Sequence, residues 1–162
     1  MNTDTLISRP LFRVQLQKNC LFLQPYYYFL MAKQSKPRRT KKKIDESALL
    51  AELAIKGIQE KKGKEIISFD LRNISNGVCD YFVVCHAEST TQVAAIARSV
   101  DEVVFKSTKE HPWCSEGFEN AEWILLDFVT VVVHVFREDR RRFYNLERLW
   151  ADANMVKIAG NY

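Results

Sequence analysis

Residues 123–150 read WILLDFVTVVVHVFREDRRRFYNLERLW, and this stretch decides most of the fold. Two apolar runs, 123–128 and 131–136, are separated only by Val129 and Thr130. That separation is the spacing of an antiparallel hairpin with a two-residue loop. Such loops favour Gly, Asn or Asp at positive φ, so the β-branched Val129 is an unusual residue for this turn.

A hairpin with this loop fixes the side of the sheet on which each side chain lies. The predicted pairs are Phe128 with Val131, Leu126 with Val133, Leu125 with His134, Ile124 with Val135 and Trp123 with Phe136. Because side chains alternate along a strand, one face is wholly apolar and must be core: Ile124, Leu126, Phe128, Val131, Val133 and Val135. The other face is apolar at one end and polar at the other: Trp123, Leu125, Asp127, Val132, His134 and Phe136. A face of this mixture lies either under a helix or against a partner.

Hydrophobic periodicity and capping residues predict the other elements around this hairpin. The expected elements are a helix from Asp45 to residues 61–63, strands at 65–71 and 80–86, a helix from the capping Ser89 to Thr108, a short strand within 112–117, and a C-terminal helix that packs Phe143, Leu146, Leu149 and Trp150 on the sheet. The order of these elements indicates an α+β domain with five strands.

The 162-residue chain has a net charge of +4, but the charges are unevenly distributed. Residues 1–43 contain ten basic residues and one acidic residue (net +9), whereas residues 44–162 contain fourteen basic and nineteen acidic residues (net −5). We predict a disordered basic extension at 1–43 and one folded domain at 44–158. An acidic domain suits a basic partner better than it suits naked nucleic acid.

The first thirty residues include an apolar run, CLFLQPYYYFL at 20–30, that is too short to cross a bilayer. They lack the arrangement of a secretory signal peptide, but their basic residues in an acid-poor segment leave a mitochondrial transit peptide as an alternative. Met31 opens MAKQSKPRRTKKK, which is typical of an ordinary protein start. We therefore interpret residues 1–30 as lying upstream of the native start and expect a cytoplasmic protein, with organellar targeting as the alternative.

No motif for catalysis or cofactor binding stands out. The cysteines (Cys20, Cys79, Cys85, Cys114) and histidines (His86, His111, His134) have the spacing of neither a zinc site nor a disulfide framework. The five glycines form no phosphate-binding loop. Asp80 and Asp127 at strand ends have the chemistry of magnesium ligands, but no D-x-D motif or Gly-Ser loop accompanies them. We predict no cofactor and no metal.

Three features are weighed as binding residues. His134, alone in a strand, is more typical of a hydrogen-bonded structural position than of a general base. The run 140–142 of three arginines is expected to start a helix, where positive charge opposes the helix dipole. A solvated helix start and a contact with RNA phosphate are therefore about equally supported. Trp123 suits a core and an interface equally well.

Six motifs together resemble the ribosomal silencing factor family, also called Iojap-related or RsfS proteins. They are D-Y-F-V-V at 80–84, S-x-x-Q-V-x-x-I-A at 89–97, E-G at 116–117, W-x-x-L-D at 123–127, V-V-H-V-F at 132–136 and F-Y-x-L-E-x-L-W at 143–150. The resemblance covers residues 46–153. Two departures are Val129-Thr130, where the family commonly has Gly-Asp, and residues 85–88, where it commonly has a small or Gly-Thr-containing stretch.

The resemblance implies an α+β fold related to nucleotidyltransferases but lacking their catalytic residues, here a mixed five-stranded sheet with flanking helices. It also implies binding to the large ribosomal subunit through the large-subunit protein numbered fourteen. Such binding blocks joining of the small subunit and represses translation. A homodimer is expected when the protein is free, and no enzymatic activity is expected.

We predict that the mixed face of the hairpin and the helix after it bind this partner, since the resemblance assigns the strand region to that contact. An interface needs a desolvated apolar anchor with polar groups at its rim. The predicted binding residues are Trp123, Leu125, Leu126, Asp127, His134, Arg141, Arg142 and Tyr144. Two rival functions are a magnesium-dependent nucleotidyltransferase-like enzyme that uses Asp80 and Asp127, and an RNA-binding module in which the basic tail at 32–43 contacts ribosomal RNA.

Overall fold

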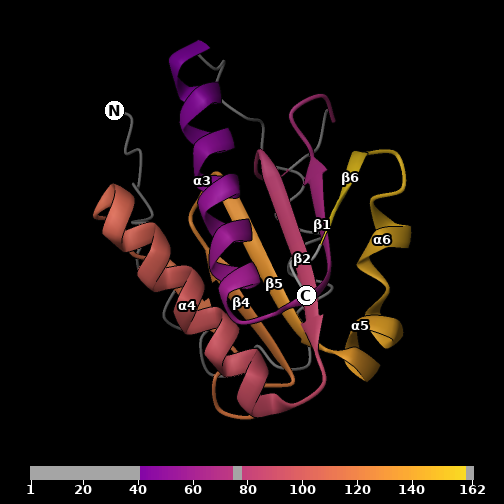
Figure 1. Ribbon diagram of the computed structural model, residues 1–162. Coiled ribbons are helices and arrows are strands. Elements are labelled where there is room, and N and C mark those ends of the chain that lie inside the picture. Colours follow the sequence, from indigo (N-terminus) through magenta and orange to yellow (C-terminus); the bar gives the residue numbers. More distant parts are fainter. Residues whose placement is uncertain (1–40, 75–77, 160–162) are drawn as a thin grey trace, which may run out of the picture. The chain divides into compact units, whose positions relative to one another are not determined.

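The structure, a computed structural model, describes residues 41–74 and 78–159 (Figure 1). Its elements in chain order are α3 (Lys41–Glu60), β1 (Lys64–Asp70), β2 (Tyr81–Ala87), α4 (Thr90–Thr108), β3 (Cys114–Glu116), β4 (Trp123–Asp127), β5 (Val131–Arg137), α5 (Glu138–Tyr144), α6 (Leu146–Leu149) and β6 (Asn154–Ile158). The predicted order of elements is confirmed as far as α5, and α6 and β6 are additions to it.

Six strands form one sheet in the order β3-β4-β5-β2-β1-β6. The central pair β2 and β5 is parallel and the other neighbouring pairs are antiparallel, so the predicted α+β fold with a mixed sheet is confirmed. The predicted number of five strands is wrong, because residues 154–158 form the edge strand β6 against β1. Four of its five residues are exposed, and a strand that buries so little carries no apolar pattern to reveal it.

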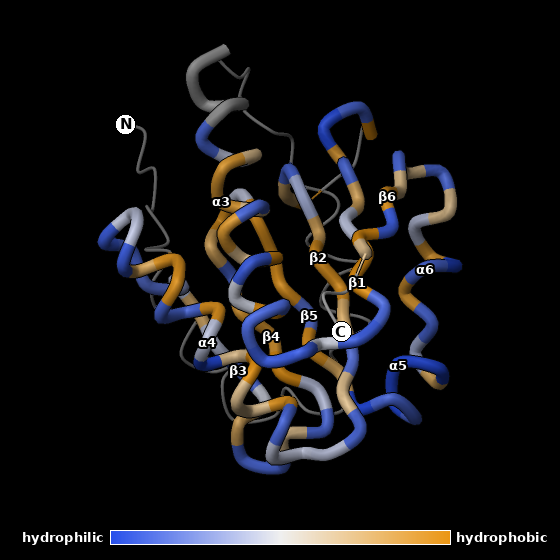
Figure 2. The backbone as a smooth tube through the Cα atoms, viewed as in Figure 1, coloured by the Kyte–Doolittle hydropathy of each residue, from blue (hydrophilic) through white to orange (hydrophobic). Residues whose placement is uncertain are grey.

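The β4–β5 hairpin has the predicted register, from Trp123 opposite Phe136 to Leu126 opposite Val133. The predicted apolar face packs under α3 and α4, which lie side by side on one face of the sheet (Figure 1). Hydrophobic residues follow the strands beneath both helices, whereas the outer sides of the helices are hydrophilic (Figure 2). The register therefore places the core where the alternation predicted it.

The hairpin loop is strained at Val129. This residue has φ 70°, a left-handed conformation that β-branched residues rarely adopt. The Thr130 N–H donates to the Phe128 carbonyl (2.8 Å), which closes a turn of only three residues. Asp127 supports the turn, because its Oδ1 accepts a hydrogen bond from the Val129 N–H (2.7 Å).

Close contact between α3 and α4 depends on Gly57. A Cβ at this position would lie 2.6 Å from the Val100 Cα, so any larger residue would push the helices apart. At its start, α4 has the predicted cap, since the Ser89 Oγ accepts from the Gln92 N–H (3.2 Å). The Gln92 side chain donates to the Lys61 carbonyl (3.2 Å) and so ties this start to the end of α3.

The C-terminal part differs from the single predicted helix. Asn145 has φ 45° and separates α5 from α6, so the three- and four-residue spacing does not continue across it. Phe143 and Leu149 were predicted to pack on the sheet, but both are exposed. The arginine run was expected to start the helix. Instead α5 begins at Glu138, and Arg141 and Arg142 occupy its last turn, where the helix dipole favours cations.

The N-terminal boundary is earlier than predicted. Helix α3 begins at Lys41 instead of near Asp45, so the last three residues of the predicted extension are helical. Residues 1–40 of that extension lie outside the described residues. Among the helices that the structure describes, none is both long and apolar enough to span a membrane.

We expect Val129→Gly to stabilise the protein. Glycine adopts positive φ without the side-chain clash, which costs about 1–2 kcal/mol here, although its greater freedom in the unfolded chain offsets about 0.5–1 kcal/mol. Urea unfolding should show a net gain of about 1 kcal/mol. Val156→Gly, in the exposed strand β6, should instead lower stability. A Val129→Gly variant less stable than the wild type would contradict the strained turn.

Candidate partner-binding surface

The structure places the eight predicted binding residues in four locations. Trp123, Leu125, His134 and Tyr144 lie on the side of the sheet opposite α3 and α4, Arg141 and Arg142 line a pocket beside α5, and Leu126 and Asp127 lie apart from both groups. Leu126 belongs to the core beneath the two long helices. Asp127 is half-buried at the hairpin turn, where its carboxylate holds the loop.

An aromatic layer fills the space between the sheet and the two short helices. Its members are Phe82, Trp123, His134, Phe136, Tyr144 and Trp150. The Trp123 ring stacks on Phe136 (4.7 Å between centroids) and is covered from α5 by Tyr144 (4.7 Å). Trp150 meets Phe82 edge-on at 5.3 Å. This layer is a second core, on the opposite side of the sheet from the core under α3 and α4.

The aromatic layer leaves little of the predicted surface open. Trp123 and Leu125 are each 5% exposed and His134 is 1% exposed, whereas Tyr144 is half-buried. Of the two alternatives for this face, a position under a helix describes the free chain, because Tyr144 of α5 covers Trp123. A role for these residues in partner binding stays a prediction, and it requires either contact through Tyr144 or displacement of the short helices.

His134 is held as a neutral acceptor. The Trp123 Nε1–H donates to the His134 Nδ1 (3.3 Å), so the imidazole proton lies on Nε2. Complete burial lowers the pKa of His134 to about 3, since the charged form would lose its hydration. This geometry agrees with the structural interpretation of the histidine and gives no general base near pH 7.

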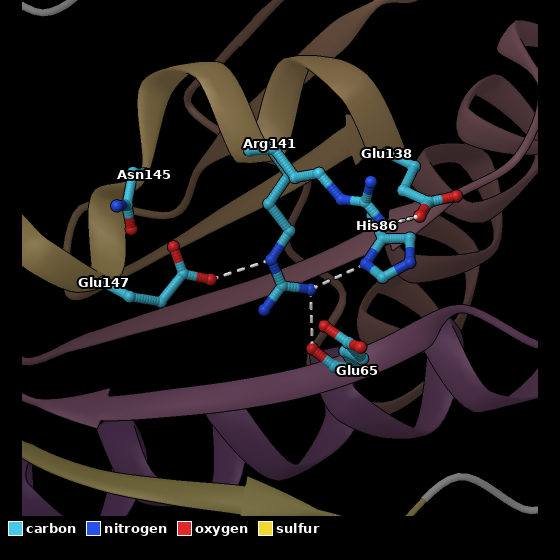
Figure 3. Close-up of a pocket in the computed structure, with 7 residues that line it drawn as sticks. Glu65, His86, Glu138, Arg141, Asn145 and Glu147 are labelled. Atoms are coloured by element: carbon cyan, nitrogen blue, oxygen red, sulfur yellow. Dashed lines mark hydrogen bonds and ion pairs between the residues drawn. The ribbon is translucent and has the colours of Figure 1, made fainter.

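Arg141 is the main polar group of a pocket of about 300 Å³ (Figure 3). The pocket is lined by Glu65, His86, Glu138, Arg141, Arg142, Asn145 and Glu147. The buried Arg141 guanidinium donates from Nε to Glu147 (2.7 Å) and from Nη1 to the Glu65 carbonyl (2.7 Å). It thus connects α5 with α6 and with β1. Arg142 is 79% exposed in its side chain and pairs with Glu138.

A bulge in β1 creates the acceptor for Arg141. Between the pairs Lys64–His86 and Ile67–Val84, β1 has one residue more than β2, and Glu65 adopts φ 44°. The arginine satisfies the carbonyl that the bulge turns away from the sheet. The sequence gives no sign of this bulge, because glycine, the usual residue at positive φ, is absent from it.

His86 is a second pocket residue that sequence reasoning did not identify. Its Nδ1 lies 3.0 Å from the Arg141 Nη1, which must be the donor, so His86 is a neutral acceptor. Burial and the neighbouring Arg141 charge both lower the pKa of His86. In the sequence, only the position of His86 at the end of a predicted strand pointed to a role for it.

Ion pairs hold the start of α5 to the loop before β4. Arg137 pairs with Glu122 (3.0 Å) and with Asp139 (2.6 Å), and Arg140 pairs with Glu122 (2.8 Å). Such exposed pairs are individually weak, but a network shared by four side chains restricts the helix more than one pair does. The network therefore helps to keep Tyr144 above Trp123.

The two aspartates weighed as magnesium ligands have structural hydrogen bonds. The buried Asp80 Oδ2 accepts from the Ser47 Oγ (2.6 Å), and Asp127 accepts from the Val129 N–H. Among the side chains that the structure describes, no group of three or more His, Cys, Asp or Glu is arranged to hold a metal ion. The arrangement is suited to packing and recognition.

We expect Trp123→Ala to destabilise the domain by about 3–5 kcal/mol, because it empties a buried site between Phe136 and Tyr144. Thermal or urea unfolding would measure this loss. Trp113→Ala is the matched control. Trp113 is 51% exposed, so its replacement should lower the free energy of unfolding much less. Equal stability of the Trp123→Ala variant and the wild type would show that Tyr144 does not cover Trp123 in solution.

We also expect stability to fall between pH 7.5 and pH 5.5. The unfolded chain takes up a proton at His134 near its ordinary pKa of about 6.5, whereas the folded chain does not until its pKa of about 3. At pH 5.5 this linkage costs about 1.4 kcal/mol, and His86 acts in the same direction. Urea unfolding at both pH values measures the difference, which His134→Gln should reduce. If the free energy of unfolding falls between pH 7.5 and pH 5.5 by as much in His134→Gln as in the wild type, His134 is not the source of the pH dependence.

Comparisons with known proteins identify the family. The family described as "Ribosomal silencing factor during starvation" matches residues 43–161. The chain is 40% identical over 111 residues to ribosomal silencing factor RsfS of Halalkalibacterium halodurans, covering 68% of this chain and 93% of that protein. It is 30% identical over 87 residues to the Mus musculus protein named mitochondrial assembly of ribosomal large subunit protein 1, covering 49% and 38%. A crystal structure from Bacillus halodurans has a TM-score of 0.59 and 36% identity, covering 68% of this chain and 99% of that one. The chain belongs to the ribosomal silencing factor family, the RsfS or Iojap-related proteins.

Proposed function

We propose that this protein binds the large ribosomal subunit through a basic protein on its intersubunit face, the large-subunit protein numbered fourteen. Bound there, it blocks joining of the small subunit and represses translation. The observation that carries this proposal is the family match over residues 43–161, which contains every strand of the described sheet. The name of the mouse relative, which refers to the large ribosomal subunit, supports the same partner.

Charge supports a protein partner. Residues 44–162 have fourteen basic and nineteen acidic residues, a net charge of −5. A negative domain is attracted to a basic ribosomal protein and repelled by RNA phosphates, so its charge favours the first contact and speeds encounter with it. The +9 charge of residues 1–43 leaves a secondary contact of this segment with ribosomal RNA as part of the proposal.

The predicted binding residues fit two different roles. Arg142 and the half-buried Tyr144 and Asp127 are accessible for contact. Trp123, Leu125, His134 and Arg141 are buried, so in the free chain they support the surface from beneath, whereas the buried Leu126 belongs to the core on the other side of the sheet. The protein acts in this proposal by occupying a surface and needs no chemistry of its own. The cytoplasmic location and the free homodimer remain predictions.

Two rival functions have separate tests. For a nucleotidyltransferase-like enzyme, magnesium with a nucleoside triphosphate should raise the melting temperature, since a ligand of the native state stabilises it. The hydrogen bonds of Asp80 and Asp127 to Ser47 and Val129 disfavour this rival. For an RNA-binding module led by residues 32–43, deletion of that segment should abolish binding, and the affinity should fall steeply with salt.

Co-sedimentation with separated ribosomal subunits tests the proposed function. We expect the protein to pellet with the large subunit and not with the small one, and to increase the fraction of free subunits when both are mixed. A truncated chain that begins at residue 41 should retain both effects if the folded domain carries the contact. Absence of the full chain from the large-subunit pellet would refute the proposal, and binding lost only on truncation would support the RNA-binding rival.

A further inference from the structure

The segment that forms α5 and α6 is held to the sheet by few buried contacts. Both helices lie within the described part of the chain: Arg141 is the one buried residue of α5, and α6 has none. Tyr144 and Trp150 add two half-buried rings. Helices of seven and four residues with so little buried surface have low local stability. The hydrogen bonds of one arginine therefore contribute much of what keeps this segment on the sheet.

Arg141 attaches the segment to the sheet through two kinds of acceptor (Figure 3). Its Nη1 donates to the Glu65 carbonyl (2.7 Å), to the Lys64 carbonyl (3.5 Å) and to the His86 Nδ1 (3.0 Å). Its Nε donates to Glu147, which lies on α6 and so belongs to the segment itself. Backbone carbonyls do not titrate, whereas an imidazole ordinarily takes up a proton near pH 6.5. His86 is thus the sheet acceptor that a mild fall in pH removes.

Protonation of His86 reverses the character of its contact with Arg141. A neutral imidazole accepts at Nδ1, but an imidazolium has an N–H at both nitrogens and accepts nothing. A proton taken from water onto Nδ1 would set a second donor and a second positive charge 3.0 Å from the Arg141 Nη1. His86 lines the pocket of about 300 Å³ and is 6% exposed, so solvent protons reach its ring.

Charged groups surround His86 on several elements: Lys64 and Glu65 on β1, Glu138, Arg141 and Arg142 on α5, Glu147 on α6, and Glu88 just after β2. Burial lowers the pKa of His86, and so do Arg141 and Lys64, whereas Glu65 and Glu138 oppose them. The net direction is downward, so the attached segment disfavours the charged imidazole. Attachment is therefore favoured above the ordinary histidine pKa of about 6.5 and weakens as the pH falls below it.

We propose that His86 and Arg141 form a pH-sensitive latch, from which α5 and α6 detach when the imidazole takes up a proton. The sheet stays intact, because the backbone pairing of β2 with β1 and β5 does not involve Arg141. Detachment separates Tyr144 from Trp123 and opens one end of the aromatic layer to water. The latch is a property of the chain itself and does not rest on the proposed function.

Hydrogen exchange of single amides, followed by NMR at pH 7.5 and pH 5.5 and corrected for intrinsic rates, tests the latch. The Asn145 N–H donates to the Arg141 carbonyl (2.9 Å) and the Trp150 N–H to the Leu146 carbonyl (3.2 Å), so both report detachment. If His86 has a pKa of about 6.5 when detached and stays neutral when attached, the opening constant rises about tenfold at pH 5.5. Central amides of α4 report global unfolding, which should be rarer than detachment at both pH values.

Three variants identify the titrating group. In His86→Asn, the Oδ1 takes the place of the imidazole Nδ1 and accepts from Arg141 without titrating, so we expect the opening constant to be the same at both pH values. In Arg141→Ala the latch is absent, so the segment should be equally open at both. His134→Gln replaces the other buried histidine of this side of the sheet and should keep the tenfold change.

Each outcome decides for or against the latch. A change in the wild type that is absent from His86→Asn and Arg141→Ala but present in His134→Gln supports it. An opening constant that does not change in the wild type, or that still changes in His86→Asn, refutes it. Loss of the change in His134→Gln alone would assign the titration to His134 and refute the latch. If His86→Asn does not fold, Arg141→Ala decides, because a tenfold change that persists without the guanidinium is incompatible with the proposal.

Discussion

The alternation of side chains along β4 and β5 determines where five of the eight predicted binding residues lie. A shift of one residue would exchange the two faces of the hairpin, so the register must be fixed. The turn fixes it, although Val129 is strained. The Thr130 carbonyl accepts from the N–H groups of Asp80 (2.8 Å) and Tyr81 (3.2 Å), which joins the turn to the start of β2. The strain is tolerated because this junction aligns the parallel pair at the centre of the sheet.

Sequence reasoning succeeded where a single local pattern decides the structure. The Ser89 cap, the periodicity of α4 and the β4–β5 register follow from spacing alone, and the structure confirms them. It failed where packing decides. Strand β6 is held by its pairing with β1 and buries almost nothing. A pattern also shows that the face with Trp123 is partly apolar, but it does not show which element covers that face.

The burial of Trp123 and the exposure of Phe143 have the same origin. Helical spacing across 138–150 would put Phe143 and Leu149 on one side, as the sequence suggests. Asn145 in the left-handed conformation interrupts that spacing. Trp150 packs against Phe82 of the sheet as predicted, whereas Tyr144 contacts the sheet in place of Phe143. Side-chain periodicity predicts which residues share a face only while the helix is continuous. Tyr144, which covers the buried Trp123, is therefore the sequence neighbour of the exposed Phe143.

The arginine run acquires its role from the same rearrangement. Helices of seven and four residues are too short to be stable alone, and a buried guanidinium is costly unless its donors are satisfied. Arg141 meets both conditions, because Glu147, the Glu65 carbonyl and His86 accept its hydrogen bonds and belong to three different elements. The bulge that exposes the Glu65 carbonyl and the arginine that binds it thus depend on each other. Together they hold in place α5 and α6, which carry the exposed Phe143 and Leu149.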